Sequence, residues 1–120
     1  MTQRINIVLD GENEQGYGVL SCGGHEFRCL GKYGYKYPKD STINASDKDH
    51  NYFSKQFSCK LPWAIKLDGN KGVYIHECVT PPYDMSHGNS HGCINLDPEP
   101  AEWVYGWIQG RTRVVITYPW

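Results

Sequence analysis

Short β-like runs recur along the chain, and turns rich in glycine separate them. In RINIVL at residues 4–9 apolar and polar residues alternate, and YGVLSC at 17–22 and VYIHEC at 73–78 are similar runs. Alternation with a period of two is typical of a strand with one buried face. The 13 glycines, nine tyrosines and four tryptophans suit tight turns and pleated surfaces. We therefore expect a mostly β fold.

The order of these runs predicts two hairpins. DGENEQG reads as the turn between residues 4–9 and 17–22, and DGNKG joins WAIKL at 63–67 to residues 73–78. The segment from residue 25 predicts a further short strand. Residues 39–58 are polar and aperiodic, so we expect a long surface loop there. His76 is expected on the second strand of the second hairpin.

One helix is predicted near the end of the chain, over DPEPAEWVYGWIQG at residues 97–110. Asp97 is a suitable N-cap, Pro98 a suitable first helical residue and Gly110 a suitable end. The expected apolar face consists of Trp103, Val104, Trp107 and Ile108. Residues 111–120 then predict a closing strand.

Length and charge exclude several classes of protein. With 120 residues the chain has room for one core, so we expect a single domain over residues 1–120. A formal charge of −1 without a Lys/Arg cluster argues against nucleic acid as a partner. The apolar runs are far shorter than the ~18 residues of a membrane span, and the first residues lack the apolar region of a signal peptide. We expect no membrane partner.

The stretch MSHGNSHGCINL, residues 85–96, contains Ser-His-Gly twice, and only the second copy is followed by a cysteine, Cys93. Such a cysteine is ordinarily a buried filler, a disulfide partner or a metal ligand, and the odd total of five cysteines leaves at least one unpaired. Gly88 and Gly92 favour catalysis, because they allow a sharp turn whose N–H groups could face a developing oxyanion.

A nucleophilic cysteine needs a base, because the thiolate is the attacking species. The candidate bases are His76, His87 and His91. On a strand Glu77 faces away from His76, so a backbone carbonyl is the expected orienting group. A paired imidazole also predicts a lowered thiol pKa for Cys93.

Zinc is the main alternative. His76-x-Cys78 and His91-x-Cys93 form two pairs with zinc-like ligands. Their one-residue gaps are shorter than those of common zinc knuckles, and a capped helix follows the second pair directly. A zinc-stabilised binding domain therefore stays open as an alternative, although we assign no metal or cofactor.

The segments VYIHE at 73–77 and SHGCINL at 90–96 resemble the L,D-transpeptidase (YkuD-type) family of bacterial cell-wall enzymes. That family has a strand histidine followed downstream by Ser/Thr-His-Gly-Cys-apolar-Arg-apolar, and His76 lies 17 residues before Cys93. The resemblance implies a β-sandwich or barrel with one helix after the catalytic cysteine.

The resemblance also implies roles for individual residues. Cys93 is the implied nucleophile and His76 the implied base, while His91, together with Ser90 and Gly92, shapes the pocket and the oxyanion site. Substrate contacts are expected at Ser90, Gly92, Asn95, Tyr74 and His87. The chain departs from the family pattern in having Asn95 in place of an arginine, and Glu77 where a glycine or small residue often follows the histidine.

The function that the resemblance implies is acyl transfer on peptidoglycan stem peptides in the periplasm or cell wall. Its outcome is transpeptidation, carboxypeptidase or endopeptidase action, or exchange of a D-amino acid. A compact antibacterial effector is one setting for such a chain, and an immunity protein would then be its partner. A catalytically inactive relative that binds stem peptides is a further alternative.

Overall fold

The fold is seen in a computed structural model that describes residues 3–11, 15–55, 58–68, 72–78 and 92–120. Within these residues, nine strands form one sheet in the order β4-β9-β1-β2-β3-β8-β7-β6-β5. The strands are β1 (Gln3–Leu9), β2 (Tyr17–Cys22), β3 (His25–Leu30), β4 (Asp40–Ile43), β5 (Lys48–Ser54), β6 (Cys59–Asp68), β7 (Val73–Glu77), β8 (Ile94–Leu96) and β9 (Thr112–Thr117). The mostly β fold is confirmed.

Both predicted hairpins are present. β1 pairs antiparallel with β2, and β6 pairs antiparallel with β7. The closing strand β9 returns beside β1 and pairs with it in parallel. In β1 the alternation of the sequence is matched by burial, because Ile5, Ile7 and Leu9 are inside.

The predicted surface loop over residues 39–58 is wrong for most of its length. It contains β4, a short 3-10 helix at Ala45–Asp47 and β5. β4 and β5 are the two edge strands of the sheet. Edge strands bury only part of their surface and tolerate polar residues, so their sequences lack the apolar alternation that marks β1.

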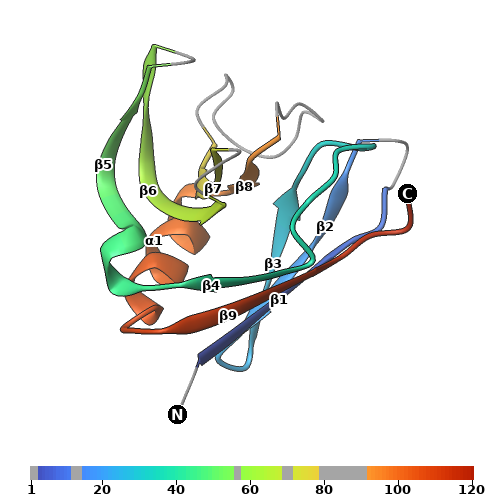
Figure 1. The fold of residues 1–120 in the computed structure, drawn as a ribbon, viewed down its shortest axis with the longest axis horizontal. Coiled ribbons are helices and arrows are strands. Elements are labelled where there is room, and N and C mark those ends of the chain that lie inside the picture. The colour runs from blue at the N-terminus through green and yellow to red at the C-terminus, as the bar shows by residue number, and fades with distance from the viewer. Residues whose placement is uncertain (1–2, 12–14, 56–57, 69–71, 79–91) are drawn as a thin grey trace.

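The sheet is strongly curled, and the one α-helix of the described residues lies against one arm of it (Figure 1). α1 spans Pro98–Trp107 and contacts β6, β7 and β8, while β4 at one edge reaches β6 near the other. The principal core collects residues from both arms of the curl, including Ile7, Ile65 and Ile94. The strongly curled, barrel-like sheet with one helix after residue 93 agrees with the expected fold class.

The helix begins as predicted, with Asp97 as N-cap and Pro98 next, and its predicted apolar face is confirmed at Val104 and Ile108 but not at Trp103. Ala101 and Val104 are buried, and Ile108, the C-cap, is buried as well. Trp103 is 36% exposed and lies against His25 and Phe27 on β3. Trp103 therefore extends the helix contact sideways, whereas Trp107 is partly buried and packs against the core. No helix in the described part of the chain is long and apolar enough to cross a membrane.

Candidate active site

The parallel pairing of β7 with β8 brings two distant parts of the sequence together. Ile75 pairs with Ile94 and His76 with Asn95, so Cys93 lies at the start of β8, beside Tyr74. Alternate residues of a strand share a face. His76 and Cys93 therefore lie on the same face of neighbouring strands, although 17 residues separate them in the sequence.

His76 is held in one orientation by the main chain. Its side chain is 4% exposed, and Nδ1 lies 2.6 Å from the carbonyl oxygen of Glu77. A carbonyl oxygen only accepts, so Nδ1 carries the proton and Nε2 of the neutral ring is the basic nitrogen. Burial lowers the pKa of His76, and the hydrogen bond to the Glu77 carbonyl offsets part of this effect. The expected backbone carbonyl orients the ring.

The carboxyl group of Glu77 has different surroundings. Burial raises its pKa, and the nearby carboxylate of Glu102 on α1 raises it further. This placement agrees with the strand geometry, in which the Glu77 side chain faces away from His76.

Cys93 is half-buried, and its Sγ donates a long hydrogen bond of 3.9 Å to the carbonyl oxygen of Gly72. Burial raises the pKa of the Cys93 thiol, and the backbone N–H of Tyr74 lowers it by a smaller amount. The lowered thiol pKa predicted from the sequence is therefore wrong for the described structure, because desolvation of the thiolate outweighs the hydrogen bond.

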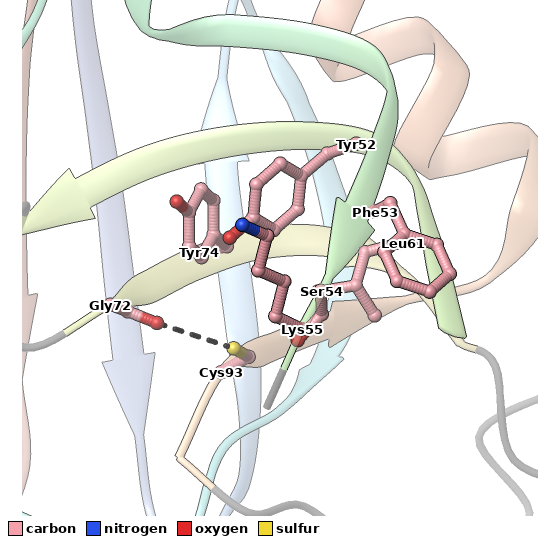
Figure 2. A pocket seen from close by; sticks show the side chains of 8 residues that line it. All are labelled: Tyr52, Phe53, Ser54, Lys55, Leu61, Gly72, Tyr74 and Cys93. Atoms are coloured by element: carbon pink, nitrogen blue, oxygen red, sulfur yellow. Dashed lines mark hydrogen bonds between the residues drawn. The ribbon is translucent and has the colours of Figure 1, made fainter. Parts of the chain in front are cut away.

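Cys93 opens onto a pocket of about 250 Å³ (Figure 2). Strand β5, the turn after it, β6 and β7 supply most of its wall. The lining residues are Tyr52, Phe53, Ser54, Lys55, Leu61, Gly72, Tyr74 and Cys93. Tyr52 and Tyr74 stack with ring centroids 4.6 Å apart. Burial and a hydrogen bond with Tyr52 raise the pKa of Tyr74 to about 12, so its hydroxyl stays protonated at neutral pH.

Gly92 shapes the backbone immediately before the thiol. It is buried with φ of +132°, a conformation that side chains disfavour. A Cβ at this position would lie 3.2 Å from the Tyr35 ring. The backbone conformation therefore favours glycine, and the Tyr35 ring leaves little room for a side chain.

Comparison with known proteins gives a family for this geometry. The L,D-transpeptidase catalytic domain family, YkuD, matches residues 12–116. The chain belongs to the L,D-transpeptidase family. A search of curated proteins gives no match.

Solved structures of L,D-transpeptidases share the fold. The enzyme from Stackebrandtia nassauensis is 21% identical with a TM-score of 0.66, over 96% of this chain and 57% of that one. The enzyme from Mycobacterium smegmatis is 23% identical with a TM-score of 0.63, over 94% of this chain and 58% of that one. L,D-transpeptidase 1 of Mycobacterium tuberculosis is 18% identical with a TM-score of 0.65, over 96% of this chain and 62% of that one. The chain thus spans about three fifths of the length of these L,D-transpeptidases.

The structure places only some of the predicted substrate residues at the pocket of this L,D-transpeptidase domain. Tyr74 lines it together with Cys93. Asn95 does not line it; its side chain is 7% exposed, on β8 between Leu30 of β3 and His76 of β7. His87, Ser90 and His91 lie outside the described residues.

Sequence reasoning missed Tyr52 and Lys55. Both belong to the segment predicted as a loop, and the structure brings them to Cys93 through the pairing of β5 with β6. The signal that could have located Tyr52 is the β-prone pair Tyr52-Phe53 within a polar stretch, whereas no local pattern marks Lys55.

For the zinc alternative, the described residues contain no group of three or more His, Cys, Asp or Glu side chains that could hold a metal ion. Cys78 is buried in a small cluster with Tyr17 and Leu30. The partner histidine of the second predicted pair, His91, is among the residues that are not described.

Proposed function

We propose that the chain is a cysteine acyl-transfer enzyme that acts on peptidoglycan stem peptides, with Cys93 as nucleophile and His76 as general base. The observation that carries the proposal is the hydrogen bond between His76 Nδ1 and the Glu77 carbonyl. Both residues lie on β7, which pairs with β8, the strand that directly follows Cys93. This hydrogen bond directs the basic Nε2 away from the Glu77 carbonyl, and burial keeps the ring neutral. A neutral, oriented imidazole is what a general base requires.

The first half-reaction follows from these protonation states. Burial favours a neutral thiol at rest, so His76 Nε2 takes the Sγ proton as sulfur attacks the carbonyl carbon of the third stem residue. Collapse of the tetrahedral intermediate breaks the bond to the nitrogen of the fourth residue. The imidazolium returns its proton to that leaving amine, and a thioester on Cys93 remains.

The second half-reaction resolves the thioester. An amine of another stem peptide attacks the thioester carbonyl, gives a proton to His76, and the thiolate leaves and is reprotonated. This is transpeptidation. Water in place of the amine gives carboxypeptidase or endopeptidase action, and a free D-amino acid gives exchange. The same two side chains serve all three outcomes, so the acceptor decides among them.

This substrate places the action in the periplasm or cell wall. We also propose a role as an antibacterial effector, for which an immunity protein would be the partner. Growth arrest on periplasmic but not cytoplasmic expression in a susceptible bacterium would support that role.

The enzymatic proposal is tested by intact mass after incubation with purified stem tetrapeptides. We expect a thioester adduct and a released or transferred product for the parent protein. His76→Ala and Cys93→Ala should each lower turnover by on the order of 10³-fold, and the double variant should lose little more, because the two groups act as a unit. Cys59→Ala, at the other half-exposed thiol, is the matched control and should keep full activity.

Two results would contradict the proposal. Peptide binding without adduct or product in the parent would identify an inactive relative that binds stem peptides. Stoichiometric zinc, with unfolding on chelation, would identify a zinc-stabilised domain, since a structural zinc site contributes directly to folding.

A further inference from the structure

Among the described residues that line the pocket beside Cys93, one carries a charge. Of the described residues that line it, seven are uncharged at neutral pH and only Lys55 is ionised. Figure 2 shows the Lys55 side chain extending from the end of β5 into the pocket, toward the rings of Tyr52 and Tyr74. The exposed Lys55 ammonium therefore contributes a positive charge to the same pocket as Cys93.

The other charged side chains described near the pocket either do not line it or have hydrogen-bond or ion-pair partners elsewhere. Lys48, at the start of β5, donates to two carbonyls of the helix end. The carboxylate of Asp49 adds to the raised pKa of Tyr74, but Asp49 does not line the pocket. Within the described ranges the one ion pair joins Arg113 to Asp40, on β9 and β4. Asn95, next to His76 in register, carries no charge.

We propose that Lys55 is the anion-binding residue of this site and pairs with a carboxylate of the stem peptide next to the scissile bond. The inference rests on the proposed function and adds a specificity-determining residue to it. A lysine ammonium is a compact point charge on a flexible stem, which suits a carboxylate whose position changes as the thioester forms. The stacked rings of Tyr52 and Tyr74 lie on the same wall, and the raised pKa of Tyr74 keeps its hydroxyl protonated.

A substrate-free experiment tests the charge itself. Cys93 is alkylated with iodoacetate, which carries a carboxylate, and with neutral iodoacetamide, and each rate is read by peptide mapping. We expect Lys55→Met to lower the iodoacetate-to-iodoacetamide rate ratio by about threefold, the effect of one partly screened charge pair. Lys55→Arg should restore the ratio, and Lys55→Glu should lower it further.

Lys60→Met is the matched control. Lys60 is exposed on neighbouring β6 but does not line the pocket, so its removal should leave the ratio unchanged. An unchanged ratio in Lys55→Met, or an equal fall in Lys60→Met, would overturn the proposal. Neither result depends on turnover of peptidoglycan.

A substrate experiment then identifies the carboxylate. Stem peptides are compared with their C-terminal carboxylate free or amidated, and separately with a third-residue side-chain carboxylate free or amidated. Lys55→Met should raise KM for the free acid by several-fold, with kcat little changed, and should have no effect on the peptide in which the recognised carboxylate is amidated. The arm in which this selectivity appears names the source.

The two proposals fail in different ways. If the parent protein processes no stem peptide but Lys55→Met still changes the alkylation ratio, the proposed substrate is wrong and the anion site stands. If the parent turns over peptides and Lys55→Met has equal KM for free and amidated forms of both carboxylates, the acyl transferase stands and the role of Lys55 is wrong.

Discussion

At the scale of single residues, the site depends on how burial acts on two ionisable groups. Burial keeps His76 neutral and raises the pKa of Cys93, so both groups favour the uncharged form at rest. In the mechanism proposed above, the proton is therefore transferred during attack, in contrast to a preformed thiolate–imidazolium pair. Exclusion of water disfavours either charge alone.

The lowered pKa of His76 makes a prediction about stability against pH. As pH falls through the ordinary value of 6.5, the unfolded chain binds a proton that the folded chain resists. The stabilising contribution of the neutral ring is therefore present above pH 6.5 and is lost as pH falls toward the folded-state pKa. His76→Gln does not titrate, so we expect its free energy of unfolding to approach that of the parent between pH 8 and pH 5.

Urea unfolding of both proteins across this range measures the difference. Glu77 has a raised pKa, so its contribution has the opposite sign: it is present below its unfolded-state pKa and is lost as pH rises through the folded pKa. That contribution is common to parent and variant and cancels when the two are subtracted. A gap that stays constant from pH 8 to pH 5 would show that His76 titrates alike in both states.

At the scale of elements, a lysine on an edge strand holds the end of the helix. Lys48 Nζ on β5 donates to the carbonyl oxygens of Tyr105 at 2.7 Å and Ile108 at 2.6 Å. It also lies 4.3 Å from the centre of the Tyr105 ring. The last carbonyls of a helix lack intrahelical partners and carry partial negative charge. β5, which lines the Cys93 pocket, is thereby attached to α1.

We expect Lys48→Met to lower the free energy of unfolding by about 1–2 kcal/mol, because two carbonyls lose a charged donor while the aliphatic stem is kept. Urea denaturation measures this loss. Lys60→Met, on the neighbouring strand, should change stability by less than about 0.5 kcal/mol. Equal values for the two variants would show that Lys48 does not support the helix end.

At the scale of the whole molecule, the short strand β8 joins two arms of the sheet. β4, β9, β1, β2 and β3 lie on one side of it, and β7, β6 and β5 on the other. All three residues of β8 are buried, and its pairing with β3 is a single register pair, Leu30 with Asn95. Side chains from both arms share one core, so we expect them to unfold together.

Ile94→Ala tests this cooperativity. Ile94 is fully buried, and its truncation should cost about 2–5 kcal/mol, against about 1 kcal/mol for Ile94→Val. Because both arms share the core, hydrogen exchange should accelerate equally in β1 and β6. Faster exchange in one arm alone would show that the arms are separate cooperative units.

Several features of this protein could be predicted from the sequence alone, and they are local. Alternation marked β1, turn residues marked both hairpins, and Asp97-Pro98 marked the start of α1, because each depends on neighbouring residues. The resemblance of short motifs singled out His76 and Cys93, whose catalytic roles are proposals, and the parallel pairing of β7 with β8 brings these two segments side by side.

Only the tertiary structure decided what depends on distant contacts. The polar edge strands β4 and β5 form because β9 and β6 lie beside them, and local sequence carries no sign of those partners. The same pairing brings Tyr52 and Lys55 to Cys93. Burial then raises the thiol pKa that the sequence predicted to be low. Desolvation is a property of everything packed around a group, so it follows from the fold and not from the neighbours in the chain.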